Sequence, residues 1–162
     1  MHRPFAALVA LFFVPPLVPG AEVIAPWEPA DLGAWRTRGR AELAKPEGKG
    51  RNGKRCFEIR VDPEVQPNYP QFYRDFRTGI AAGDRFRVQA DVRGKGVSQD
   101  PGAYLAVEFL QGDRRVGIAH SQTGKDNGAK GWEMLSVPDV SCPQGATTMR
   151  VSLILHATGT AW

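Results

Sequence analysis

Hydrophobic and polar residues alternate along two neighbouring runs near the middle of the chain. The runs are residues 85–93 (RFRVQADVR) and residues 103–110 (AYLAVEFL), and a connector rich in Gly, Ser, Asp and Pro joins them. A period of two places successive side chains on opposite faces of a sheet. Each run therefore predicts a strand with one face on a core and one largely polar face turned outward.

The same alternation predicts further strands on both sides of this pair. They are residues 55–61, 69–76, 114–120, 132–137 and 147–156, with weaker candidates at 34–38 and 40–44. Arg74 falls on the apolar side of its run, which indicates a bulge, a sheet edge or a shifted register. After residue 20 we find no stretch with apolar residues at helical spacing for three turns. Short strands separated by Gly and Pro turns predict an all-β fold, an antiparallel β-sandwich of jelly-roll type.

The first 20 residues have the pattern of an export signal. A short polar start is followed by an apolar run at residues 5–14, then by prolines and a small-residue site before Ala21. The run is too short to span a bilayer as a helix, although a buried N-terminal helix is an alternative. Cleavage before Ala21 would leave 162 − 20 = 142 residues. We therefore expect a secreted protein, extracellular or periplasmic, with no membrane insertion after cleavage.

The basic charge of the chain is small and scattered. The formal net charge is +4, and removing Arg3 leaves 20 Lys+Arg against 17 Asp+Glu, a net of +3. A nucleic-acid partner would require the cations to gather in one patch or stripe. They instead lie beside acidic residues, as at Asp84-Arg85. We do not expect the protein to bind nucleic acid.

The two cysteines, Cys56 and Cys142, leave two interpretations open. In an oxidising compartment they could form a disulfide that closes a long loop. They could equally be two separate thiols. Two cysteines and three histidines without ligand spacing do not predict a zinc site.

The sequence contains no recognisable catalytic motif. A Gly-x-Ser-x-Gly elbow and a His-Glu-x-x-His pair are both absent. Asp91 and Glu108 could share a face, but the neighbouring Arg87 and Arg93 disfavour the protonated acid that glycoside hydrolysis requires. We therefore expect a domain that is not an enzyme.

Several segments together resemble a known family. They are residues 83–93 (GDRFRVQADVR), 104–109 (YLAVEF), 131–138 (GWEMLSVP), 149–155 (MRVSLIL) and 159–162 (GTAW). Their order is similar to that in carbohydrate-binding modules of the family 4/9 (CenC-like) type, which have a galactose-binding-domain-like jelly roll. The resemblance covers most of residues 22–162. It implies that Trp132 belongs to the core.

The resemblance also implies a function and a departure from the family pattern. It implies a non-catalytic module that binds a polysaccharide or other glycan, in a longer protein whose downstream domain could be a glycoside hydrolase. In the family, a segment like residues 159–162 runs into an acidic pair and a last strand, whereas this sequence stops at Trp162. We therefore expect residues 21–162 to be a C-terminally truncated domain with its final strand missing. In the family, the acidic pair often completes a structural calcium site. Because the sequence stops before that pair, we expect no cofactor, and a structural calcium ion is unsupported.

Sugar recognition combines aromatic rings, which stack on the apolar face of a pyranose, with planar polar groups for its hydroxyls. The outward positions of the predicted strands supply both, and the candidate ligand-binding residues are Tyr73, Gln89, Arg93, Tyr104 and Glu108. Each has a plainer alternative, because tyrosines can simply cover a sheet and polar residues can simply be solvated. The alternative function is a structural or protein-interaction β-sandwich module appended to a larger extracellular protein.

Overall fold

The computed structural model describes residues 10–13, 25–26, 33–44, 50–51, 55–64, 68–97, 101–124 and 131–162, with the backbone alone for the first two ranges. The strands are β1 (Ala10–Phe13), β2 (Ala25–Pro26), β3 (Arg36–Arg38), β4 (Glu42–Ala44), β5 (Glu58–Val61), β6 (Gln71–Phe76), β7 (Arg85–Val92), β8 (Gly94–Lys95), β9 (Gly102–Gln111), β10 (Arg114–His120), β11 (Glu133–Ser141), β12 (Thr148–His156) and β13 (Gly159–Ala161). Across the described ranges, no helix has the length and hydrophobicity needed to cross a membrane.

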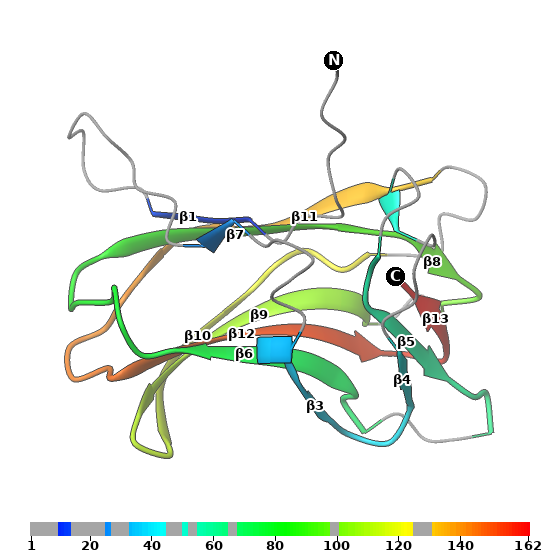
Figure 1. Cartoon of the computed structure of the whole chain (residues 1–162), viewed down its shortest axis with the longest axis horizontal. Coiled ribbons are helices and arrows are strands. Elements are labelled where there is room, and N and C mark those ends of the chain that lie inside the picture. The colour runs from blue at the N-terminus through cyan, green and yellow to red at the C-terminus, as the bar shows by residue number, and fades with distance from the viewer. Residues whose placement is uncertain are drawn as a thin grey trace.

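The strands form two facing layers and a small sheet at one end (Figure 1). One layer has the order β11-β7-β1-β2, and the other has the order β10-β9-β12-β6-β3. The small sheet has the order β4-β5-β13-β8. All pairings between these strands are antiparallel. The predicted all-β sandwich of jelly-roll type is confirmed.

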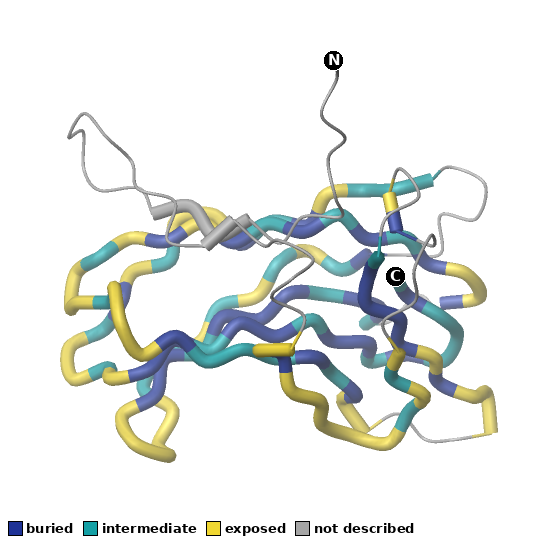
Figure 2. Tube along the Cα trace, in the orientation of Figure 1, coloured by how far each residue is buried: buried dark blue, intermediate teal, exposed yellow. Residues whose placement is uncertain are grey.

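The core lies between the two layers, where the buried strand positions face one another (Figure 2). Phe86 from β7 and Phe109 from β9 meet there, with ring centroids 6.2 Å apart. Phe72, Met149 and Leu155 are fully buried beside them. Alternate residues of β7 and β9 point inward as the sequence predicts, because only that register removes the apolar face from water.

Two details of the strands differ from the sequence-based expectation or refine it. The sequence predicts a strand that ends at residue 137, but β11 continues through Pro138 to Ser141 across a register shift between Val137 and Val140. A bulge accepts a proline because the unpaired residue needs no ladder donor. Arg74 lies in continuous register with β12, so it marks neither a bulge nor a shifted register. The strand on the other side, β3, pairs with β6 only as far as Tyr73, so Arg74 lies at the edge of the sheet.

Cys56 and Cys142 are both buried free thiols, so the disulfide that the sequence left open is not formed. Cys142 hydrogen-bonds through its backbone to Gly83 and Asp84, at the start of β7. Cys56 lines a cavity that Asp91, near the other end of β7, also lines. The two thiols therefore lie near opposite ends of that strand, which explains why they do not pair.

Strand β1 lies within the predicted export signal. Its backbone pairs with Phe86–Gln89 of β7, on the edge opposite β11. The short β2 then pairs with β1. The removal of residues 1–20 stays a prediction.

Candidate functional site

The side of the five-stranded sheet that faces away from the core carries a mixture of aromatic, polar and charged side chains, and we call it the outer face. The strand registers place on it Arg115, Ile118 and His120 from β10, Tyr104, Ala106, Glu108 and Leu110 from β9, Thr148, Arg150, Ser152, Ile154 and His156 from β12, Gln71, Tyr73 and Asp75 from β6, and Arg36 and Arg38 from β3. Adjacent strands lie about 4.8 Å apart, so these residues form rows across the sheet.

The middle row of the outer face has small residues at its centre. In register, His120, Ala106, Ser152, Tyr73 and Arg36 follow one another from β10 to β3. Ala106 is only 2% exposed and Ser152 only 1%, so larger neighbours on the same face cover them. The Ser152 hydroxyl has no hydrogen-bond partner in the described structure. At the centre of the face the accessible surface is therefore formed by the rows on either side, whereas His120 and Arg36 at the two ends of the middle row are exposed.

Aromatic rings gather at one end of the outer face. Tyr104 packs edge-on against His120, with ring centroids 5.5 Å apart. Tyr69, just before β6, lies with its ring centroid 4.0 Å from that of His156 and is 49% exposed. Burial raises the pKa of the Tyr104 phenol, and nearby Tyr69 and Glu108 raise it further. Tyr104 thus stays protonated in neutral solution, so its hydroxyl can donate a hydrogen bond as well as accept one.

A hydrogen-bonded ion pair holds the other half of the face in place. Arg150 Nε lies 2.6 Å from one Asp75 carboxylate oxygen, and its Nη2 lies 3.0 Å from the other. The same guanidinium lies 4.6 Å from the centre of the Tyr73 ring. The hydrogen bond from Arg150 holds the pKa of Asp75 below its ordinary value, against the opposing effect of burial. Arg150 therefore fixes the Tyr73 ring and covers part of it.

Glu108 is partly engaged by a second arginine. Its carboxylate lies 3.1 Å from Arg115 Nη1, and the pair is exposed. Ile118, the register neighbour of Glu108 on β10, is 43% exposed. An exposed isoleucine beside a carboxylate gives this edge both apolar surface and hydrogen-bond acceptors.

The structure brings together three of the five residues predicted to bind a ligand. Tyr73, Tyr104 and Glu108 share the outer face. Gln89 does not, because β7 belongs to the opposite layer, where Gln89 pairs with Ser136 of β11. Arg93 lies between β7 and β8 with its guanidinium over the rings of Trp132 and Trp162. These two residues therefore cannot touch a ligand bound on the outer face.

The candidate residues chosen from the sequence omit several residues of this face that carry charge or an imidazole, among them three arginines and a histidine. Arg36, Arg38 and Arg150 come from β3 and β12, and His120 comes from β10. The spacing of Arg36 and Arg38 around Thr37 is the same alternation that identified the other strands. It was weak evidence because β3 is only three residues long.

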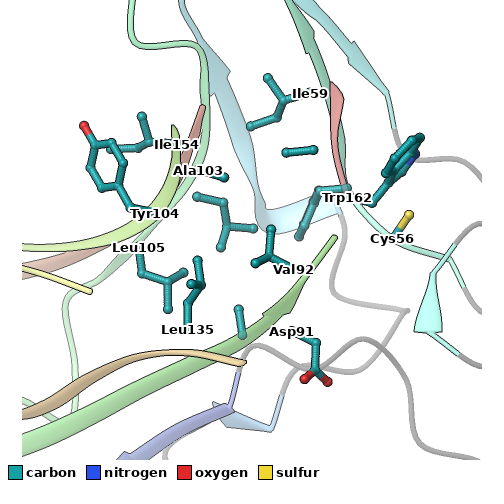
Figure 3. Close-up of a pocket in the computed structure, with 14 residues that line it drawn as sticks. Cys56, Ile59, Asp91, Val92, Ala103, Tyr104, Leu105, Leu135, Ile154 and Trp162 are labelled. Carbon is teal, nitrogen blue, oxygen red and sulfur yellow. The ribbon is translucent and has the colours of Figure 1, made fainter. Parts of the chain in front are cut away.

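A small apolar cavity lies where the three sheets meet (Figure 3). Its volume is about 60 Å³, and its walls include Ile59, Leu135 and Leu153. The Tyr104 hydroxyl and the Asp91 carboxylate point away from its centre (Figure 3). Because its walls are mostly apolar and include small side chains such as Ala103 and Ala161, we interpret the cavity as a packing gap.

Trp162 joins the small sheet to the sandwich. Its backbone exchanges hydrogen bonds with Arg93 at 2.9 and 3.0 Å, and its indole N–H donates to the Glu58 carboxylate. The alternation of β5 predicts an outward Glu58, but Trp162 covers it and leaves the residue only 7% exposed. Trp132 is half-buried and packs against the core, as the resemblance implies.

No set of three His, Cys, Asp or Glu side chains in the described ranges is arranged to hold a metal ion. The carboxylates of the outer face, Asp75 and Glu108, instead face arginines.

Comparison with known proteins identifies solved structures of the same fold. The CBM22-2 xylan-binding domain of Xyn10C from Paenibacillus barcinonensis superposes with a TM-score of 0.61 at 14% identity, covering 80% of this chain and 87% of that one. The CBM22-1–GH10 modules of Clostridium thermocellum endo-1,4-β-D-xylanase 10B, solved with xylohexaose, give a TM-score of 0.58 at 18% identity, covering 79% of this chain and 24% of that one. The enzymatically active domain of tailspike protein 4 from bacteriophage CBA120 gives 0.53 at 10% identity, covering 79% and 18%.

No protein-family model matches the chain, and no curated protein matches it. At these identities the likeness to solved structures establishes the fold, and function must be argued from the site. The chain has the jelly-roll fold of family 22 carbohydrate-binding modules.

Proposed function

We propose that the protein is a non-catalytic module that binds a polysaccharide on its outer face. The observation that carries this proposal is the composition of that face. Tyr69, Tyr73 and Tyr104 lie among planar polar groups such as Gln71 and Glu108, all on one side of one sheet. Tyrosine rings stack on the apolar faces of sugars, and carboxylate and amide groups hydrogen-bond to sugar hydroxyls.

The structural neighbours supply a starting ligand for this proposal. One is described as a xylan-binding domain, and another was solved with xylohexaose. Xylan is therefore the first polysaccharide to test, followed by β-glucans and galactans. The tailspike domain shows that proteins with other tasks share this fold, so the neighbours alone do not decide the ligand.

The face also argues against hydrolysis as its function. The two carboxylates that the face offers, Asp75 and Glu108, each have an arginine guanidinium within 3.1 Å. A general acid for glycoside hydrolysis must keep its proton near neutral pH, which the hydrogen bond from Arg150 opposes at Asp75 by lowering the pKa of that carboxyl. Binding without turnover therefore fits these contacts better.

Affinity electrophoresis in gels that contain xylan, β-glucan or galactan tests the proposal. We expect at least one polymer to retard the wild-type protein and Tyr104→Ala to lose most of that retardation. Met134→Ala is the matched control, because Met134 is 56% exposed on β11 of the opposite layer. Equal retardation of both variants would place binding elsewhere. Failure of every polymer to bind would favour the alternative, a protein-interaction module.

We also propose that the protein is exported and that residues 1–20 are removed. The apolar run followed by prolines and small residues supports this proposal. Mass spectrometry of the protein recovered from the periplasm or the medium should show a chain that begins at Ala21. Recovery of the full-length chain from the cytoplasm alone would contradict it.

A further inference from the structure

The charges on the outer face do not balance. Asp75 and Glu108 oppose Arg36, Arg38, Arg115 and Arg150, so the face carries 4 − 2 = +2. Both carboxylates are already engaged, Asp75 by Arg150 at 2.6 Å and Glu108 by Arg115 at 3.1 Å. The side chains of Arg36 and Arg38 form no hydrogen bond or ion pair within the described residues. The uncompensated charge therefore lies on β3.

The position of these two arginines connects them to the aromatic part of the face. Arg36 pairs in register with Tyr73, and Arg38 pairs with Gln71. They are two residues apart on one strand, so their Cα atoms are about 7 Å apart and both side chains leave on the same face. Arg36 also contributes to lowering the pKa of Asp75, which places its charge close to the Asp75–Arg150 pair.

The guanidinium group has a specific complement among sugar substituents. Its planar fork donates two parallel hydrogen bonds to a carboxylate, whereas a neutral hydroxyl accepts one at a time and provides no charge. Two unpaired forks beside Tyr73 and Gln71 can therefore bind a carboxylate while the ring and the amide contact the sugar that carries it. The whole chain, with a formal net charge of +4, would also attract a polyanion.

We propose that the outer face prefers an acidic polysaccharide, one whose sugars carry carboxylate groups, and that Arg36 and Arg38 bind those carboxylates. This inference rests on the proposed function, since it names the chemical class of glycan that the same face takes. The rest of the face contacts the sugar rings, so binding requires both a pyranose surface and an anionic group.

A matched pair of polymers tests the preference. Isothermal titration with glucuronoxylan and with the same polymer after chemical reduction of its carboxyl groups isolates the charge. We expect the acidic polymer to bind about tenfold more tightly at low salt, and this advantage to shrink in 0.5 M salt because exposed ion pairs are screened. Arg36→Gln/Arg38→Gln should lose most of the advantage while it keeps the affinity for the reduced polymer.

The control variant removes the same number of positive charges from another part of the molecule. Arg87→Gln/Lys95→Gln takes two exposed cations from β7 and β8, outside the five-stranded sheet, and should leave both affinities unchanged. Equal binding of the two polymers would overturn the acidic preference and leave the proposed function standing. Binding of neither polymer would overturn the inference and exclude xylan as the ligand of the proposed function. Equally tight binding of a single-stranded DNA oligonucleotide would show that charge alone is recognised and would also overturn the inference.

Discussion

Individual side chains on the outer face are held by contacts that can be tested separately. Asp75 accepts two hydrogen bonds from Arg150, whose guanidinium in turn lies over Tyr73. Removal of the charge from Asp75 should loosen both neighbours. We expect Asp75→Asn to reduce the free energy of unfolding by about 1–2 kcal/mol at neutral pH, because the charged hydrogen bonds are lost from a half-buried pair.

The same pair gives a pH dependence with a definite sign. The pKa of Asp75 is lower in the folded protein than the ordinary value of 3.8. Its stabilisation is therefore complete above pH 3.8 and disappears as the pH falls through the lower, folded-state pKa. Urea unfolding should show the gap between wild type and Asp75→Asn narrowing below about pH 4. Asp113→Asn, an exposed turn carboxylate, is the control, and a constant gap would contradict the assignment.

Gly159 occupies a position that a side chain cannot enter. It has φ of +106°, and an added Cβ would collide with the Gly96 carbonyl group. Gly83 has a similar φ of +87° with open space around it. We expect Gly83→Ala to cost about 1 kcal/mol and Gly159→Ala clearly more, since only the second adds a backbone clash to the strained conformation. Thermal unfolding of both variants measures the difference, and equal costs would contradict the close approach of residues 96 and 159.

The sequence predicted correctly which residues of the long strands are buried. It predicted burial less well for residues that a distant segment of the chain covers. Phe86 and Phe109 were correctly predicted to be inside, because alternation over eight or more residues fixes a face. Glu58 was expected outside, yet Trp162, 104 residues away, covers it. No local pattern predicts such a long-range contact.

At the level of strands, the small sheet depends on Trp162. Trp132 and Trp162 both lie against Arg93, but the hydrogen bond to Glu58 comes from Trp162. We expect Trp162→Phe to reduce the free energy of unfolding by about 1–3 kcal/mol, because the buried Glu58 carboxylate loses a donor. Trp132→Phe, which preserves a ring over Arg93, should cost less. Similar losses in chemical denaturation would argue against a special role for the Glu58 contact.

Strand β1 adds a ladder to one edge of β7, while β11 pairs with the other edge. The inner face of β7 packs on Phe109 and its neighbours, which do not belong to β1. We therefore expect a chain without residues 1–20 to keep a cooperative unfolding transition and its near-ultraviolet circular dichroism signal. Loss of that signal with retained β content would show that β1 is required for core packing.

Alternation also explains why only part of the candidate site could be predicted from strands alone. Tyr104 and Glu108 on β9 and Gln89 on β7 all read as outward positions, and all three do face away from the core. The outward side chains of the two layers point in opposite directions, and the alternation does not reveal which strands share a layer. Gln89 was therefore grouped with residues on the far side of the molecule.

For the whole molecule, the fold follows from the sequence more securely than the function does. Many inward positions with apolar side chains specify a sandwich redundantly, so an error in one strand changes little. A binding surface depends on a few side chains from separate strands, as with Arg36, Tyr73 and Arg150, whose meeting is a product of the strand order. That order became visible only in the folded chain.

Chemical-shift mapping can locate a bound polysaccharide on one face of the folded protein. In ¹H–¹⁵N spectra of the folded protein titrated with xylo-oligosaccharides and acidic xylo-oligosaccharides, we predict that the perturbed amides cluster on β6, β9 and β12, around Tyr73, Tyr104 and Ser152. Amides of β7 and β11 should stay unchanged. Perturbations confined to β7 and β11, or none with any glycan, would contradict the claim that the outer face of the five-stranded sheet binds a polysaccharide.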